Sequence, residues 1–157
     1  DGGTMKTIPA SDVATFAGGG KILQVVSTRS TSHYTTTTAS YQDCANFNVD
    51  ITPSATSSKI YLNVTGNIYQ ATAAKYSVAT IYRDSTDLGA ASDKGLTNIY
   101  TSSSGDGGDS LSLSVLDSPS STSQITYQVY ISSPSGGTAV LNENGTKGVI
   151  TAFEIAG

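Results

Sequence analysis

Apolar and polar residues alternate along much of the chain from Lys21 onward, which is the period-2 pattern of half-buried β-strands. The clearest example is a segment in which Leu111, Leu113 and Val115 alternate with three serines. Such a segment places one apolar row against a core and one hydroxyl row toward solvent. It is therefore predicted to be a strand.

Two further segments, 60–65 and 125–131, show the same alternation. Tyr127 is in phase with the apolar residues of its segment, so its ring is expected in the core. Tyr61 and Tyr130 are out of phase and are expected on the opposite faces of their strands. An outward tyrosine offers a large apolar face with a hydrogen-bonding tip, which suits a subunit interface. Tyr61 and Tyr130 are the predicted interface residues.

The remaining chain contains seven more short segments that favour strands. They are 22–27, 33–38, 47–51, 74–83, 97–101, 138–142 and 149–155. Segments rich in Gly, Pro, Ser and Asp separate them and are predicted turns, at 52–54, 84–89, 105–108, 118–120 and 134–137. About ten short strands with no long helical period predict an all-β fold, an antiparallel β-sandwich or jelly roll.

The first twenty residues have a different pattern. Asp1-Gly2-Gly3 is typical of a hairpin tip, 4–8 of the strand leaving it, and 9–16 of a short helix, before three glycines interrupt the pattern. The incoming hairpin strand is missing and Met5 is internal, so the chain is expected to be a piece of a longer protein. We predict a neck or linker over residues 1–20 and one β-sandwich domain over 21–157, a usual domain size.

Composition narrows the classes of partner. Only 13% of residues are charged, while 24 are Ser and 22 are Thr, so neutral polar groups must cover the surface. The net charge is −4 and the eight Lys and Arg residues are scattered, which argues against nucleic acid. No apolar run approaches the length of a membrane helix, so no membrane insertion is expected. Cys44 is the single cysteine, and we expect a buried thiol outside any disulfide.

Catalytic and metal-binding patterns are weak. His33 is the single histidine, and no nucleophile elbow accompanies it. The twelve Asp and Glu residues are dispersed, mostly in turns, rather than paired as in a glycosidase. Gly105 to Asp109 has the oxygen-rich appearance of a calcium loop but lacks the spacing of an EF-hand, so a plain loop is favoured and calcium stays open. The expectation is a non-enzyme with no cofactor and no metal.

Short motifs in a fixed order along nearly the whole chain resemble the C-terminal domains of bacteriophage tail fibres, of the type abundant in phages of aquatic bacteria. They are DGGTMKTI at 1–8, GKILQVV at 20–26, ITPS at 51–54, SSKI at 57–60, IYRD at 81–84, LDSP at 116–119, TYQV at 126–129 and ITAFEIA at 150–156. The resemblance implies a jelly-roll-like β-sandwich, trimeric around a fibre axis, exposed on the virion and used to contact the host.

In such domains the loops carry recognition, which directs attention to the three longest, 71–75, 84–94 and 101–109. Tyr76, Tyr82 and Tyr100 flank them, and Asp106 and Asp109 add carboxylates; these five are the predicted receptor-binding residues. The expected ligand is a bacterial surface glycan or an outer-membrane protein. The alternative is a structural appendage or capsid decoration that binds only other virion proteins.

Overall fold

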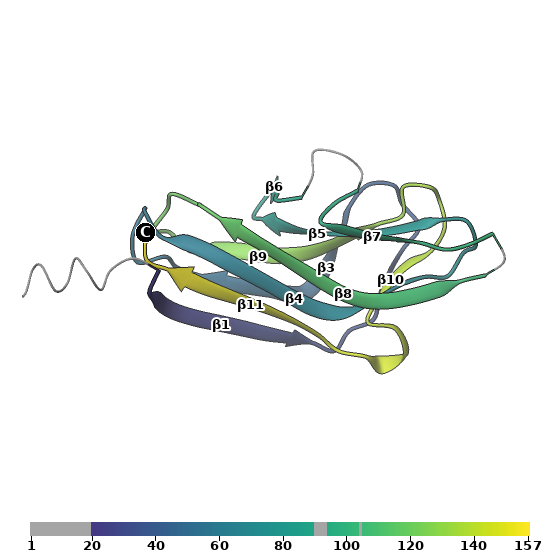
Figure 1. The fold of residues 1–157 in the computed structure, drawn as a ribbon, viewed down its shortest axis with the longest axis horizontal. Helices are drawn as coiled ribbons and strands as arrows, with labels where there is room; N and C mark the ends of the chain where they lie inside the picture. The colour runs from purple at the N-terminus through teal and green to yellow at the C-terminus, as the bar shows by residue number, and fades with distance from the viewer. Residues whose placement is uncertain (1–19, 90–93, 104) are drawn as a thin grey trace, which may run out of the picture.

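The computed structural model describes residues 20–89, 94–103 and 105–157 (Figure 1). The hairpin tip, strand and helix expected before residue 20 lie outside these residues, so the division of the chain at residue 20 stays a prediction. The described residues form two antiparallel β-sheets packed face to face. The predicted all-β sandwich is confirmed.

The first sheet contains four long strands side by side and two short ones (Figure 1). In order, the long strands are β1 (Ile22–Ser30), β11 (Gly148–Ile155), β4 (Lys59–Gln70) and β8 (Gly107–Asp117). The short strand β10 (Ala139–Leu141) pairs with the end of β4, and β2 (Tyr34–Thr36) pairs with β10.

The second sheet is built on three long strands, in the order β3 (Gln42–Ile51), β9 (Ile125–Ser132) and β5 (Tyr76–Arg83). Two short strands, β6 (Thr86–Asp87) and β7 (Thr97–Tyr100), share the outer edge of β5. A 3₁₀ turn at Glu143–Gly145 separates β10 from β11.

The order of the eight main strands identifies the type of sandwich. These are β1, β3, β4, β5, β7, β8, β9 and β11; numbered along the chain, the first, eighth, third and sixth form one sheet, and the second, seventh, fourth and fifth form the other. This arrangement is the eight-stranded jelly roll, in which consecutive strands repeatedly cross between two sheets. The molecule is therefore a jelly roll rather than another β-sandwich.

All ten predicted strands are present, with corrected boundaries. β8 begins at Gly107, opposite Gln70 of β4, so the expected turn at 105–108 and loop at 101–109 end earlier, and Asp109 lies in a strand. β3 begins at Gln42 and contains an irregularity at Asn46, whose φ is 65°. β6 and the 3₁₀ turn were not expected, because two or three residues carry no detectable period.

The core confirms the phase of the predicted strands. Tyr127 is fully buried, Tyr61 is exposed, and Cys44 is buried between the sheets. Burial, and to a lesser degree the charge of Asp43, raise the pKa of the Cys44 thiol.

Two carboxylates are enclosed at the end of the sandwich where β11 finishes. Asp117 accepts two hydrogen bonds from Arg83 Nη1, at 2.8 and 2.9 Å, and one from Tyr127 Oη at 2.7 Å. This cluster joins β8 of the first sheet to β5 and β9 of the second. Glu154 has no exposed surface and accepts hydrogen bonds from β1 and from the loop between β3 and β4.

Candidate ligand-binding site

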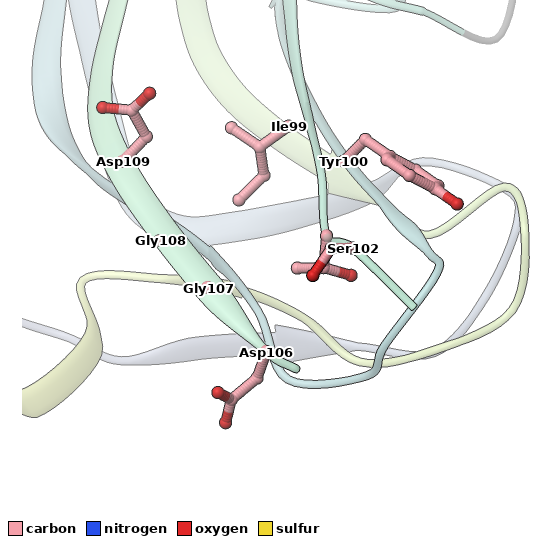
Figure 2. A pocket seen from close by; sticks show the side chains of 8 residues that line it. Ile99, Tyr100, Ser102, Asp106, Gly107, Gly108 and Asp109 are labelled. Atoms are coloured by element: carbon pink, nitrogen blue, oxygen red, sulfur yellow. The ribbon is translucent and has the colours of Figure 1, made fainter. Parts of the chain in front are cut away.

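A hollow of about 280 Å³ lies between the edge strands β7 and β8, where one sheet meets the other (Figure 2). Its lining comprises Ile99, Tyr100, Thr101, Ser102, Asp106, Gly107, Gly108 and Asp109. The hollow lies at the end of the sandwich where β8 begins, at Gly107. Asp117, at the other end of β8, is opposite Ile60, beside the end of β11. The hollow is therefore far from Gly20 and from the end of β11. Eleven residues of β8 span about 35 Å.

The backbone around the hollow is held by a buried hydroxyl. Thr101 Oγ1 donates to the carbonyl of Thr72 at 2.7 Å and accepts from the Lys75 amide at 3.3 Å. The Ala74 amide donates to the Ser102 carbonyl at 3.0 Å. The loop at 71–75 and the start of the loop at 101–106 are therefore one tied unit, although they are far apart in sequence.

A tyrosine of the neighbouring strand β4 holds the Asp106 side chain in place. Tyr69 Oη donates to Asp106 Oδ2 at 2.5 Å. This hydrogen bond is the main reason that the pKa of the Tyr69 phenol is raised, with burial and the charges of Asp106 and Glu143 adding to it. Gly108 makes the approach possible, because a Cβ there would lie 2.9 Å from Tyr69 Cδ2. Close approach of a ring explains a glycine within a strand.

An aromatic pair lies beside the hollow, on the outer face of the second sheet. Tyr76 and Tyr100 are direct partners in the β5–β7 register, with ring centroids 4.8 Å apart and an interplanar angle of 46°. Lys94 Nζ lies 4.1 Å from the centroid of the Tyr76 ring, within the range of a cation–π interaction. Tyr100 is 56% exposed, so its ring is available to a ligand.

Figure 2 shows how the two parts of the site are oriented. Ile99 projects from β7 toward β8, whereas the ring of Tyr100 points away from Asp109 and Asp106. Tyr100 therefore lines the hollow through its backbone and presents its ring on the far side of β7. The carboxylates of Asp106 and Asp109 are thus on one side of β7, beside the hollow, and the aromatic pair with Lys94 is on the other side. We call the surface formed by Tyr76, Tyr100, Asp106 and Asp109 the ridge. Such a surface can stack against an apolar ring face and hydrogen-bond hydroxyls.

The five predicted receptor-binding residues are not one cluster. Tyr76, Tyr100, Asp106 and Asp109 are gathered at the hollow end. Tyr82 instead contacts Tyr130, with ring centroids 4.1 Å apart. Since β5 runs from Tyr76 to Arg83, this second pair lies near the opposite end of the same strand.

The two predicted interface residues lie on different surfaces. Tyr61 is on the outer face of the first sheet, in ring contact with Phe153, whereas Tyr130 accompanies Tyr82 on the second sheet. Lys94 and Tyr69 are the site residues that sequence reasoning did not single out. Lys94 is the final residue of the predicted 84–94 loop, but nothing local indicated that it would reach Tyr76.

The residues considered for catalysis and metal binding are dispersed. His33 Nε2 lies 3.0 Å from Glu143 Oε2, and its side chain is 52% exposed. No group of three or more His, Cys, Asp or Glu side chains that could hold a metal occurs in the described part of the chain. Within those same residues, no helix has the length and hydropathy to cross a bilayer.

No protein-family model and no curated protein sequence matches the chain. Among solved structures, the chain is similar to PRD1 vertex protein P5, with 13% identity, a TM-score of 0.49, and coverage of 87% of this chain and 99% of that one. A VP2 subviral particle of infectious bursal disease virus gives 11% identity and a TM-score of 0.41 over 84% of this chain and 38% of that one.

A third similar structure is the C-terminal CBM6 of LamC, a marine laminarinase from Zobellia galactanivorans. Its identity is 14% and its TM-score 0.31, over 83% of this chain and 99% of that one. At these identities and TM-scores the three likenesses assign no function to the chain.

Proposed function

We propose that this chain is a non-catalytic attachment domain of a virion appendage, a tail-fibre tip on the virion surface. In this proposal the ridge bearing Tyr76, Tyr100, Asp106 and Asp109 binds a glycan of the bacterial surface. The observation that carries the proposal is the position of the ridge. The chain enters the sandwich at Gly20, and the ridge lies at the opposite end. A domain that is tethered at one end and binds at the other has this layout. The motifs that resemble tail-fibre domains support the same assignment.

The chemistry of the ridge suits a neutral or amine-bearing sugar. Tyr76 and Tyr100 offer ring faces, and Ser102, Asp106 and Asp109 offer hydroxyl and carboxylate oxygens. Carboxylates repel an acidic polysaccharide, whereas hydroxyls of a neutral sugar can donate to them. Hydrogen bonds of the Thr101 hydroxyl and the Ala74 amide already tie residues 72–75 to residues 101–102, so little ordering entropy opposes binding at these residues.

The test of this proposal is retention of host envelope by the immobilised protein. Envelopes with intact surface polysaccharide are expected to bind, and envelopes stripped of polysaccharide are expected to lose binding. Retention of stripped envelopes would indicate an outer-membrane protein instead. No retention of either preparation, across hosts susceptible to the phage, would remove host attachment from the proposal.

Tyr100→Ala and Asp106→Asn locate the contact. We expect Tyr100→Ala to weaken polysaccharide binding at least about tenfold, the loss of one stacking ring, and Asp106→Asn to weaken it less. Ser112→Ala, on the outer face of β8, is the matched control and should bind normally. Tyr82→Ala tests the second tyrosine pair; a loss confined to that variant would move the site to Tyr82 and Tyr130.

The alternative function is a structural appendage or capsid decoration that contacts only virion proteins. It is favoured by an exposed apolar surface on the first sheet, which suits a protein partner rather than a glycan. Absence of envelope binding together with stable incorporation into virions would support this alternative.

A further inference from the structure

Exposed hydrophobic side chains are concentrated on the outer face of the first sheet. Among the described residues, six large hydrophobic side chains are exposed, and five of them are on this sheet: Ile22, Leu23, Val25, Tyr61 and Leu116. Their exposed fractions range from 36% to 54%. The sixth is Tyr100, at the opposite end of the molecule.

The strand register joins three of these side chains, together with Phe153, into one band. Val25 of β1 is opposite Phe153 of β11, Phe153 is opposite Tyr61 of β4, and Tyr61 is opposite Leu116 of β8. The rings of Tyr61 and Phe153 are 6.0 Å apart. We call Val25, Phe153, Tyr61 and Leu116 the apolar row. It crosses four adjacent strands (Figure 1), a width of about 14 Å.

The apolar row is bordered by a polar row. Two residues away from the apolar row on each strand, on the side away from Gly20, the register aligns Ser27, Thr151, Asn63 and Ser114. Neither row contains a charged side chain. On its other side the apolar row is followed by Ile155 and the exposed Lys59, which are opposite each other. An apolar centre with a polar rim is the composition of many protein–protein interfaces, and monomeric soluble proteins rarely expose a contiguous apolar patch larger than a few hundred Å².

The edge strand β8, which carries Leu116, is open along its middle. β8 pairs with β4 on one side, and no other described strand pairs with it. Natural edge strands are blocked by charged side chains, above all Lys, by Pro or by a bulge. Gly107–Asp117 contains neither Lys nor Pro, its two carboxylates, Asp109 and Asp117, are near its ends, and its register with β4 is continuous. The apolar row therefore ends at a strand that another chain can approach.

We propose that a second copy of this chain covers the apolar row, which makes this face the subunit interface. The choice of occupant rests on the proposed function. The row is at the end where Gly20 enters the sandwich, since Ala156 N donates to the carbonyl of Lys21 there. Nineteen residues precede Gly20, and copies joined through their N-terminal segments in a fibre come together at this end. A mainly apolar surface fits such a copy better than it fits a charged polymer.

Substitutions in the apolar row test the proposal, with controls on the same face of the sheet. Leu116→Lys and Val25→Lys place a charge in the row. Ser112→Lys and Thr65→Lys place the same charge on the same face, beyond the polar row. Sedimentation measures the mass of each protein. From the resemblance to tail fibres, we expect the wild type to form one species of three times 16.1 kDa that persists at about 1 M salt, where surface charge is screened.

Leu116→Lys and Val25→Lys are expected to weaken association at least about 100-fold, because the interface would have to bury an unpaired ammonium. The two control variants should associate like the wild type. A monomeric wild type at about 100 μM, or row variants that associate as tightly as their controls, would overturn the proposal. Thermal melts confirm folding; should a lysine variant unfold, Leu116→Ser and Val25→Ser replace it.

Polysaccharide binding by the same proteins separates this inference from the proposed function. A wild type that associates through the apolar row but binds no envelope leaves the interface standing and removes attachment. Envelope binding by a monomeric wild type leaves the attachment function standing and removes the proposed interface.

Discussion

Glu154 is a buried carboxylate held by four donors. Gln24 Nε2 donates to Oε2 at 2.6 Å, and the Ser54 amide, Ser54 Oγ and Ser58 Oγ donate to Oε1 at 2.6 to 2.7 Å. Burial alone would raise its pKa, but the hydrogen bonds from Ser54, Ser58 and Gln24 outweigh burial and lower it to about 2. The carboxylate stabilises the fold because its charged form is bound better than water binds it.

Glu154→Gln is expected to lower the free energy of unfolding by about 2 kcal/mol at neutral pH, since bonds to a charged acceptor are replaced by weaker ones. The folded-state pKa lies below the ordinary value of 4.5, so the wild-type advantage is full above about pH 4.5 and is lost as the pH falls toward 2. Urea unfolding of the wild type and the variant at pH 7 and at about pH 2, followed by circular dichroism, measures this difference in the free energy of unfolding.

Glu143→Gln is the matched control for this prediction. Glu143 is the other glutamate of the chain and is partly exposed beside His33, so its replacement should change stability by less than about 0.5 kcal/mol. A Glu154→Gln penalty that does not shrink in acid would contradict the role given to its charge.

At the scale of the elements, Asp117 is the junction of three strands. It lies on β8, accepts from Arg83 on β5 and accepts from Tyr127 on β9. Arg83→Met leaves a nearly buried carboxylate without its cation, and we expect a loss of about 3 kcal/mol. Tyr127→Phe removes one hydrogen bond to a carboxylate and should cost about 2 kcal/mol. Denaturant melts of both variants check the order; an equal or larger cost for Tyr127→Phe would contradict it.

The elements also show how far the sequence could be read. Period-2 alternation located the strands and put Tyr127 inside and Tyr61 outside, because the phase of a strand is local information. Pairing between strands is not local. Contact of Tyr82 with Tyr130 depends on the β5–β9 register, and the burial of Glu154 depends on a loop 100 residues earlier in the chain.

The candidate site shows the same limit. Asp106 and Asp109 were recognisable as polar residues near glycines, and Tyr100 as a flanking aromatic residue. Gly107 and Gly108 were interpreted as turn residues, although Gly108 is in a strand, where it leaves room for the Tyr69 ring. Without the register of β4 and β8, this use of glycine cannot be distinguished from a turn.

At the scale of the molecule, the Cys44 thiol can report how often the two sheets separate. It lies in the core between the sheets, and burial raises the pKa of its thiol, so thiol reagents must wait for an opening of the sandwich. We expect labelling of the native protein to be at least about 1,000-fold slower than in denaturant, and to accelerate with added urea as unfolding does. Rapid labelling of the native protein would show that the sheets separate independently of global unfolding.

The pairing of β1 with β11 has a mechanical consequence. β1 begins beside Gly20, and the ridge at Tyr100 is at the far end of the sandwich. Tension between the start of β1 and a ligand on that ridge would act along the strands. The β1–β11 hydrogen bonds run across the strands, so they would be loaded together in shear rather than broken one after another. Under the proposed function, a virion dragged by flow would load the β1–β11 pair in this direction.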